Sequence, residues 1–291
     1  MPLFFQEAFL KMQGSHRILE SDGISIALFG ENHACSPAKA PFGGFFLKEN
    51  GNPARLYRLL KKIDRLAEDG FFFQLEIQLA PSCYSPDISW IIPGLLEAGY
   101  QRKWTDLNYH LPVDRPFRTH LHRSERWKLN KSARLGFYFE PVCHPDWSFI
   151  HSFILASRLR KGYSLSMSEN ELRECSRLFP GRYRVWRVAT AAGETAALGV
   201  TVDVDAAVEY LFYTADDFQF RNLSPVVMLH SGIYRMAEES GKKILDLGTA
   251  SVSGEINRGV ADFKRFLGGI QGEKIRMQKT WKHSVKHTAG K

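Results

Sequence analysis

The chain has 291 residues, 44% of them hydrophobic, and a formal net charge of +8. This length suits one large domain or two ordinary ones, and this composition fills a packed core and excludes extended disorder. The positive charge favours an anionic partner such as a nucleic acid, a phosphorylated cofactor or an anionic membrane surface, although solubility alone accounts for it equally well.

Composition also argues against several kinds of site. The four cysteines have no paired spacing, so the sequence indicates neither a disulfide framework nor a zinc site, and we expect no metal. The first residues lack a basic start followed by a long apolar run, and no apolar stretch approaches the length that spans a bilayer. We therefore expect a cytoplasmic protein without a transmembrane segment.

The first part of the chain is predicted to contain strands and two helices. Short apolar stretches bounded by turns predict strands at 23–29 and 41–47. A helix should start at Asn52, an N-cap residue, with Pro53 in its first turn, and should end at Gly70. The alternating stretch 71–79 predicts a strand, and a short helix at 87–98 and a strand at 100–111 follow.

A basic segment separates the two halves of the sequence. Residues 116–136 predict one helix that connects the halves, with eight basic or histidine side chains between Arg118 and Arg134. Basic side chains interleaved with Trp127 suit binding of tRNA or another anionic polymer. A solvated linker helix is the structural alternative.

The second part repeats this alternation of elements. Strands are predicted at 137–142, 183–190, 196–204 and 208–214, with helices at 146–162 and 168–179 between them. A helix should then run from Ser224 and Pro225 to Gly241, followed by a strand at 244–247, a short helix that ends at Gly268 and a last strand at 274–281. The polar, basic tail at 282–291 is predicted to be disordered.

The order of elements predicts an internal duplication. In both halves a cap residue and a proline open an amphipathic helix, which ends at a glycine and leads into a strand, a turn, a second short helix, another glycine and a last strand. The sequence therefore predicts an N-terminal domain at 1–115, the connecting helix at 116–136 and a C-terminal domain at 137–281.

Three short motifs in the second half resemble those of a known family. They read Arg221-Asn-Leu-Ser-Pro225, Lys242-Lys-Ile-Leu-Asp-Leu-Gly248 and Asp262-Phe-Lys-Arg-Phe-Leu-Gly268. With the duplication, they resemble the Fem-type (FemABX-like) peptidyltransferases, which are tandem GNAT-like acyltransferases. The resemblance implies an α/β (α+β) fold of two tandem GNAT-like domains, each a mixed, splayed β-sheet flanked by helices.

The same resemblance implies an activity, namely transfer of an N-acyl or aminoacyl group to an amine. The acceptor would be an amine-bearing small molecule or a peptide of the cell-wall type, and the donor acyl-CoA or an aminoacyl-tRNA. Acyl-CoA-dependent members carry a glycine-rich turn that binds the pyrophosphate, whereas residues 219–225 contain no glycine. The chain also lacks a charged heptad run long enough for the helical arm that is associated with tRNA, so the donor stays open.

Two residues are candidates for catalysis. In a GNAT-like sheet two parallel strands part, and here the parting ends would be 212–215 and 247–250. Asp246 is a candidate for the general base or for holding the ammonium group of the acceptor, and Tyr213 for stabilising an oxyanion or protonating a leaving group. The structural alternatives are an acid bonded to neighbouring groups and a core tyrosine with its hydroxyl at the rim.

Six further residues are candidates for binding the donor or substrate: Arg221, Asn222, Ser224, Thr249, Asn257 and Lys264. Arg221 precedes a helix N-terminus, where an anion is favoured, and Lys264 suits a phosphate or carboxylate. The alternatives are a surface arginine, a solvated lysine and, for Asn257, a helix cap. We expect Asp246 and Lys264 to flank one cleft at the mouth of the second sheet.

Two other interpretations remain open from sequence. The chain could be a nucleic-acid or anionic-polymer binding module on a degenerate transferase fold, for which the basic segment argues. It could also be a single-domain acetyltransferase with an unrelated N-terminal domain.

Overall fold

The computed structural model describes residues 1–48, 51–160 and 162–282. They form two compact units that interleave along the sequence. The described residues of the first unit lie within Met1–Leu107, Ser251–Glu255 and 272–282, and those of the second within Asn108–Ala250 and Ile256–Gln271. No helix in the described part of the chain is long and apolar enough to cross a membrane.

The first unit is a sheet packed against helices. Its strands lie in the order β1-β2-β3-β5-β14-β6, and β4 pairs with β2. Its elements are η1 (Leu3–Phe5), α1 (Glu7–Gln13), β1 (His16–Ser21), β2 (Ile24–Phe29), β3 (Asn32–Ser36), β4 (Phe45–Leu47), α2 (Pro53–Glu68), β5 (Phe72–Gln78), η2 (Ser82–Tyr84), α3 (Ile88–Glu97), residues 101–107 of β6 (Gln101–Pro112) and residues 272–280 of β14 (Ile270–Thr280).

Helix α2 begins and ends where the sequence predicts. Asn52 caps it, because its side-chain oxygen accepts a hydrogen bond from the backbone N–H of Arg55 at 3.0 Å, and Pro53 is its first residue. Gly70 follows it with a φ of +86°, a left-handed conformation that suits glycine. The apolar face of α2 packs into the core of the unit with Leu56, Leu59, Leu60, Ile63 and Ala67.

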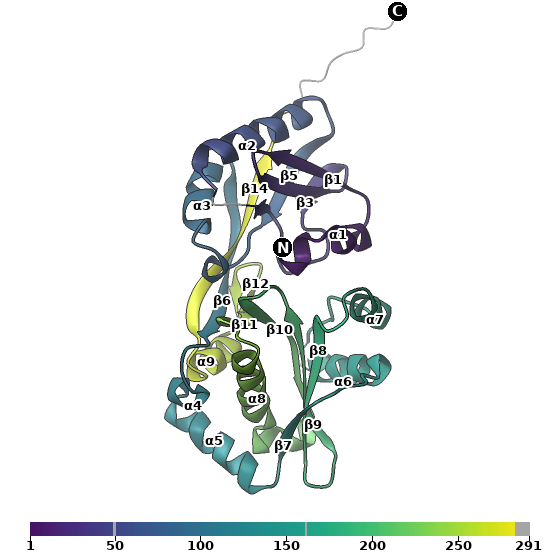
Figure 1. Cartoon of the computed structure of the whole chain (residues 1–291), viewed down its shortest axis with the longest axis vertical. Helices are drawn as coiled ribbons and strands as arrows, with labels where there is room; N and C mark the ends of the chain where they lie inside the picture. The colour runs from purple at the N-terminus through teal and green to yellow at the C-terminus, as the bar shows by residue number, and fades with distance from the viewer. Residues whose placement is uncertain (49–50, 161, 283–291) are drawn as a thin grey trace, which may run out of the picture. The chain divides into compact units, whose positions relative to one another are not determined.

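The second unit has helices on both faces of its sheet (Figure 1). Its strands lie in the order β6-β11-β10-β9-β8-β7. Its elements are residues 108–112 of β6, α4 (Phe117–His120), α5 (Arg123–Arg134), β7 (Tyr138–Pro141), α6 (Trp147–Leu159), α7 (Glu169–Leu178), β8 (Tyr183–Ala189), β9 (Thr195–Asp203), β10 (Val208–Asp216), η3 (Phe218–Leu223), α8 (Pro225–Glu239), β11 (Ile244–Thr249) and α9 (Arg258–Phe266). Two short strands, β12 (Ser251–Val252) and β13 (Glu255–Ile256), precede α9.

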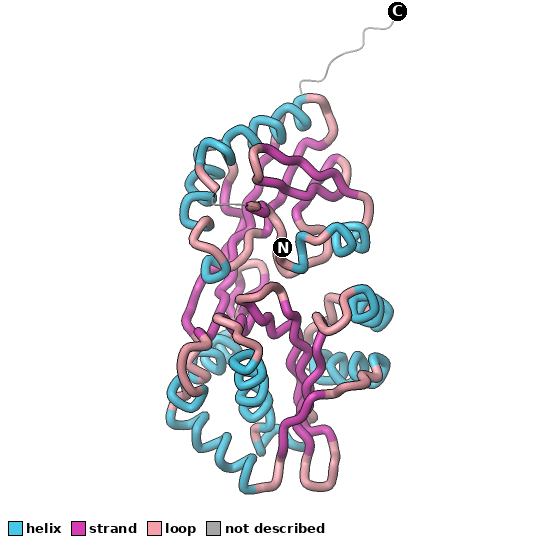
Figure 2. The backbone as a smooth tube through the Cα atoms, in the orientation of Figure 1, coloured by secondary structure: helices cyan, strands magenta, loops and turns pink. Residues whose placement is uncertain are grey.

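Each face of the second sheet is covered by a different helix. Gly199 of β9 faces α8, since a Cβ there would lie 3.0 Å from Ile233 and 3.3 Å from Leu229. Its partner in register, Thr214, faces the same helix, so the adjacent Tyr213 faces the opposite side, where α6 packs on β9 and β10. Figure 2 shows the strands of this unit between the two groups of helices.

Two strands cross over between the halves of the sequence. Residues 108–112 of β6 pair antiparallel with β11, and β14 pairs antiparallel with β5. The sequence predicts contiguous domains at 1–115 and 137–281, but each compact unit takes a strand from the other half. The boundary differs because strand partners are set by tertiary packing, which the order of elements along the chain does not specify.

The basic segment also differs from the prediction of one helix at 116–136. It forms α4 and α5, separated at Leu121, whose ψ of 137° is extended. The backbone N–H of His122 donates to the carbonyl of Phe266 at 2.8 Å, and the His122 side chain caps α5 by accepting from the N–H of Ser124. Both helices belong to the second unit, and α5 packs against α8. The predicted disordered tail lies outside the described residues, except for Lys282.

Candidate active site

The parallel strands β10 and β11 of the second unit part after a short pairing. They are in register at three positions, Val208 with Ile244, Glu209 with Leu245 and Tyr210 with Asp246. Beyond Tyr210, β10 stays paired with β9 as far as Asp216, and β11 stays paired with β6 as far as Thr249. Each strand therefore follows its outer neighbour, which confirms the predicted splayed sheet. Ligands of open α/β sheets bind at the carboxyl ends of such strands.

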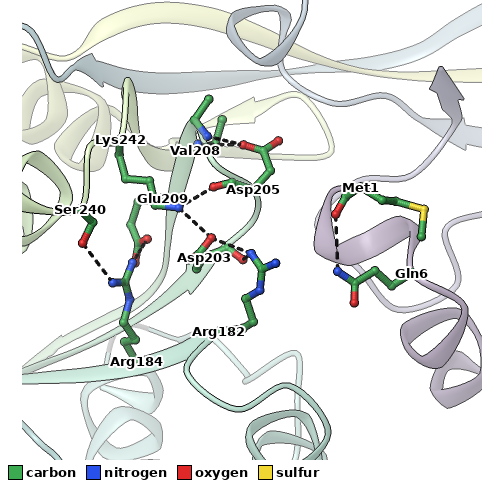
Figure 3. Close-up of polar contacts among 11 residues, drawn as sticks. Met1, Gln6, Arg182, Arg184, Asp203, Asp205, Val208, Glu209, Ser240 and Lys242 are labelled. Carbon is green, nitrogen blue, oxygen red and sulfur yellow. Dashed lines mark hydrogen bonds and ion pairs between the residues drawn. The ribbon is translucent and has the colours of Figure 1, made fainter. Parts of the chain in front are cut away.

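An ion-pair network secures the closed end of this splay (Figure 3). Glu209, which is buried at the start of β10, accepts from Arg184 of β8. Lys242, in the turn that leads into β11, donates to Asp203 of β9 at 2.7 Å and to the backbone carbonyl of Asp205. These contacts connect β8, β9 and β10 with the turn before β11. They lie at the end of the sheet where β10 and β11 still pair.

Asp246 lies in a polar row across the sheet. It is 1% exposed, and it stands opposite Tyr210 on β10 and His110 on β6. Residues opposite each other in neighbouring strands share one face of the sheet, so the three side chains lie on the α6 side with Tyr213. The Oδ1 atom of Asp246 accepts from the side-chain amide of Asn108 and from the backbone N–H of Gly248, both at 2.8 Å. The carboxylate thereby holds the bulge of β11 at Leu247.

His110 and Tyr210 flank this carboxylate in neutral forms at pH 7. Burial lowers the pKa of His110, and the charge of Asp246 opposes that shift only in part. The Nδ1 atom of His110 is buried and has no hydrogen-bond partner among the described residues. Burial and the nearby Asp246 carboxylate both raise the pKa of Tyr210, so it stays a phenol.

Tyr213 faces the segment that follows α6. Its hydroxyl lies 2.6 Å from the Ser166 hydroxyl, and burial raises its pKa despite that hydrogen bond. The guanidinium of Arg158 lies 5.8 Å from the ring centroids of both Tyr213 and Tyr163. The Tyr163 hydroxyl in turn accepts from the side-chain amide of Asn257 at 2.5 Å. Arg158 and Tyr163 thus bridge β10 to the start of α9, across the parted strands.

Three of the predicted binding residues gather at the carboxyl end of β11. The ammonium group of Lys264 donates to the carbonyl of Thr249 at 2.8 Å. Asn257 caps α9 by accepting from the N–H of Val260 at 3.1 Å, and its own N–H donates to the carbonyl of Ala250 at 2.9 Å. Lys264 therefore holds the end of the strand in which Asp246 lies. The expected arrangement of these two side chains on opposite sides of a cleft stays a prediction.

His230 lies near this end of the strand and is fully enclosed. Burial lowers its pKa to about 4, and the positive charge of Lys264 acts in the same direction. Its Nδ1 atom lies 2.8 Å from the carbonyl of Val226 in the same helix. The ring of His230 also packs edge-on against Phe263 of α9, at 5.4 Å between centroids.

The other three predicted binding residues lie in the turn before α8. Arg221 donates to Asp216 at 2.9 Å, and the carbonyl of Asn222 accepts from Lys131 at 3.3 Å. Ser224 is left-handed, with a φ of 58°, and its side chain makes no cap hydrogen bond. Several backbone N–H groups of this segment donate within it, those of Gln219, Phe220, Ser224 and Val227. Pro225 has no N–H, so the turn offers few donors to a pyrophosphate.

Two basic side chains of helix α5 make contacts within the second unit. Lys128 pairs with the buried Glu125 at 2.7 Å, and Lys131 lies 5.4 Å from the ring of the exposed Trp127 besides its bond to Asn222. Arg118 of α4 donates to Asn130 at 2.8 Å. These contacts do not favour the interpretation of the chain as a binding module for an anionic polymer.

A hollow of about 190 Å³ lies in the first unit. It is bounded mainly by aliphatic side chains, and its lining consists of Leu79, Ala80, Ser82, Ile88, Ile92, Gly272, Glu273 and Ile275. None of the predicted site residues lines it.

The sequence analysis missed four side chains of the candidate site: His110, Arg158, Tyr163 and Ser166. A signal for the first exists. Asp106, Asn108 and His110 alternate with apolar residues along β6, and the structure buries Asp106 and Asn108. Polar residues at alternate positions of a buried strand indicate a polar row across a sheet. The other three lie in or after α6 and carry no such pattern.

Comparison with known proteins identifies the fold. No protein-family model matches the chain, and no curated protein matches its sequence. Solved structures do match. FemX aligns with a TM-score of 0.71 at 13% identity, covering 96% of this chain and 92% of that one. The C-terminal domain of a putative lysylphosphatidylglycerol synthetase from Agrobacterium fabrum aligns with a TM-score of 0.58 at 13% identity, covering 91% of this chain and 84% of that one.

A tandem GNAT protein from the clavulanic acid biosynthesis pathway aligns with a TM-score of 0.51 at 12% identity, covering 88% of this chain and 78% of that one. The chain therefore has the tandem GNAT-like, Fem-like fold that the sequence predicts. The coverage extends over both units, which excludes an unrelated first half.

Proposed function

We propose that the chain is an acyltransferase that moves an acyl or aminoacyl group to an amine, with the donor bound where β10 and β11 part. The observation that carries the proposal is the end of their pairing at Tyr210, which leaves the inner edge of β10 from Leu211 to Asp216 without a β11 partner in register. Backbone groups along such an edge suit a donor carbonyl and the oxyanion that forms from it.

The contacts of the turn before α8 support an aminoacyl donor rather than acyl-CoA. The N–H groups of that turn donate within the segment, Pro225 offers none, and Arg221 is paired with Asp216. One structural neighbour is named a putative lysylphosphatidylglycerol synthetase, and lysylphosphatidylglycerol is a phospholipid that carries a lysyl group. We therefore propose an aminoacyl ester, as in an aminoacyl-tRNA, as the donor and an amine on a small molecule or peptide as the acceptor.

The polar row supplies the acid–base chemistry in this proposal. The acceptor nitrogen attacks the ester carbonyl carbon, the new C–N bond forms and the ester C–O bond breaks. His110, neutral at pH 7, takes the proton from the nitrogen at its unpartnered Nδ1 atom. The buried Asp246 carboxylate opposite stabilises the imidazolium that results.

Tyr213 and Lys264 have different roles. Because burial keeps Tyr213 protonated, its hydroxyl is suited to protonate the leaving oxygen, with Ser166 orienting it. The proton that His110 has taken from the amine then returns to Tyr213 through solvent, which restores both side chains. Lys264 acts as a positioning residue, since its ammonium group is bonded to the carbonyl at the end of β11. Asn257, bonded to Tyr163, closes the site on the side of α9.

A donor screen tests the proposal. Purified protein is incubated with a set of aminoacyl-tRNAs or acyl-CoAs and pooled amine acceptors, and products are detected by mass spectrometry. We expect an amide product from an aminoacyl-tRNA, and a loss of product with Tyr213→Phe but not with Tyr57→Phe, which lies on α2 of the first unit. The absence of product with every donor, or full activity of Tyr213→Phe, contradicts the proposal.

A further inference from the structure

Arg158 differs from other arginines of the second unit in its partners. The arginines in and just before β8 each form an ion pair with an acid, namely Arg182 with Asp203, Arg184 with Glu209 and Arg187 with Glu140. Arg158, in the last turn of α6, donates from Nε to the backbone carbonyl of Ser164 at 2.9 Å. Within the part of the chain that the structure describes, its two terminal nitrogens have no hydrogen-bond partner and its charge has no carboxylate partner. These nitrogens are therefore available to a ligand.

The Arg158 guanidinium is held in place without a ligand. It is half-buried and lies 5.8 Å from the ring centroids of both Tyr163 and Tyr213. Each tyrosine is itself fixed by a hydrogen bond of its hydroxyl, Tyr163 with Asn257 and Tyr213 with Ser166. Two aromatic rings and a carbonyl thus orient the guanidinium, so an anion that binds to it restricts the side chain little further.

The acids around α6 and the end of β10 make their contacts elsewhere. Asp146 caps the opposite end of α6. Asp216, the last residue of β10, accepts from Arg221 at 2.9 Å, and Asp217 accepts from a backbone N–H of η3. The positive charge of Arg158 is therefore not compensated by an ion pair among the described residues.

Arg158 and Asp246 are opposite charges that both act on Tyr210. Burial raises the pKa of Tyr210 most, the Asp246 carboxylate adds to the rise, and the Arg158 guanidinium opposes it. Asp246 stands opposite Tyr210 on β11, and His110 stands opposite Asp246 on β6. The α6 side of the sheet thus has a carboxylate and a histidine in one place and a cation in another, with Tyr210 near both. A molecule that complements this arrangement carries an amine and, separately, an anionic group.

We propose that Arg158 binds an anionic group of the acceptor, a carboxylate or a phosphate, so that the acceptor is an amine that also carries such a group. The two terminal nitrogens of a guanidinium match two oxygens of either group. The inference rests on the proposed function in one respect, because that function places the acceptor amine at His110. An amine without an anionic group leaves the half-buried cation unpaired and is therefore a poor acceptor.

Equilibrium binding tests the inference without requiring transfer. The full chain is screened by thermal shift against a pool of L-amino acids and against phosphoethanolamine, and against their counterparts without the anionic group, a pool of L-amino acid amides and ethanolamine. Titration calorimetry then measures the compounds that stabilise the chain. We expect an anionic probe to bind about tenfold to a hundredfold more tightly than its counterpart. Whether that probe is a carboxylate or a phosphate distinguishes the two groups.

Variants assign the difference to Arg158. Arg158→Gln should bind the anionic probe as weakly as the wild type binds its counterpart, and Arg158→Lys should recover only part of the difference, because lysine offers a point charge in place of a fork. Arg160→Gln is the matched control, since it removes an exposed positive charge two residues away. It should bind as the wild type does, and thermal melting checks that all variants are folded. The inference is overturned if no anionic probe binds more tightly than its counterpart, or if Arg158→Gln and Arg160→Gln bind alike.

Kinetics separates this inference from the proposed function. With the donor found in the screen, removal of the anionic group from the acceptor should raise KM about tenfold or more for the wild type and change it little for Arg158→Gln, while KM for the donor stays constant. Binding that depends on Arg158 without product from any donor means that the proposed function fails and the anion site stands. Transfer that is indifferent to the anionic group, or a rise in KM for the donor instead, means that the function stands and this inference fails.

Discussion

The two units contain equivalent parallel strand pairs that end differently. In the first unit β3 and β5 stay paired from Asn32 with Phe72 to Ser36 with Ile77, the whole length of β3, with one register shift between Asn32 and His33. In the second unit β10 and β11 pair at three positions and then part. The same order of elements thus produces one sheet whose parallel strands stay paired, the closed sheet, and one whose parallel strands part, the open sheet. Of these two strand pairs, the parted pair leaves backbone groups of β10 unpaired with β11.

The two sheets also differ in the surroundings of an acidic residue, Glu76 of β5 in the first and Asp246 of β11 in the second. Glu76 of β5 accepts from Lys103 and, at 3.1 Å, from Arg276. Burial acts to raise the pKa of Glu76, but the two cations outweigh it and the net shift is downward. Asp246 of β11 instead accepts from two amide groups, and it stands beside a histidine and a tyrosine. The acid of the first sheet is therefore held by two cations, whereas the acid of the second sheet is held by amide groups and has a histidine and a tyrosine as neighbours.

The largest expected effect concerns the closed end of the splay. Glu209→Ala removes one partner of a buried ion pair and should lower the free energy of unfolding by about 3 to 5 kcal/mol. Glu169→Ala, in an exposed pair with Arg173 on α7, should cost at most about 0.5 kcal/mol. Urea unfolding at pH 7 measures both. Equal losses would mean that the network does not secure the pairing of β10 with β11.

A pH effect should single out the open sheet. The pKa of His230 is about 4 in the folded chain, against an ordinary value of 6.5. Between these values the unfolded chain binds the proton and the folded chain does not, so stability falls as the pH drops from 6.5 through 4, by about 3 kcal/mol in total. His230→Gln should flatten this dependence, whereas His33→Gln, at an exposed position of the first unit, should not. Chemical unfolding at several pH values between 4 and 6.5 measures the free energy of unfolding of each variant. If the free energies of His230→Gln and wild type change with pH in parallel, His230 is not the source of the dependence.

The next effect concerns catalysis. His110→Gln should lower kcat by about a hundredfold with little change in KM, because it removes the proposed proton acceptor. The matched variant His33→Gln, beside β5 in the closed sheet, should keep the wild-type rate. Steady-state kinetics with the donor found in the screen provides the measurement. A rate loss shared by both variants would remove the functional distinction between the two sheets.

The smallest effect compares the starts of α2 and α8. Asn52→Ala should cost about 1 kcal/mol, because Asn52 caps its helix. Ser224 makes no such bond and is left-handed, so Ser224→Ala should cost less through capping, and Ser224→Gly should gain up to about 1 kcal/mol. Thermal unfolding of the three variants gives the order of their stabilities. A larger cost for Ser224→Ala than for Asn52→Ala would show that Ser224 caps its helix in solution.

Local signals made much of the fold predictable. Asn52, Pro53 and Gly70 mark the ends of α2 in the sequence, and Ser168 and Glu171 form the capping box of α7. These elements are fixed by contacts within a few residues, so a single sequence contains the information. The sequence analysis did not predict α1, β1 or β3, and it merged α4 with α5, since the break at Leu121 depends on a bond from His122 to Phe266.

The candidate site was predictable only in part. Thr249, Asn257 and Lys264 belong to one strand–turn–helix segment, and the structure does gather them at one strand end. His110 is distant from that segment in sequence and reaches Asp246 only because β6 pairs with β11. Tyr163 likewise reaches Asn257 through a fold-level contact. Residues brought together by strand exchange and by long-range packing leave no mark in local spacing.

Because β6 pairs with β11 and β14 pairs with β5, the chain cannot be divided between its two halves without separating paired strands. A fragment ending at residue 115 keeps β6 but loses β14, the neighbour of β5, and a fragment starting at residue 116 keeps β14 but loses the strand that borders β11. Neither half could be transplanted into a chimaera as an autonomous cassette.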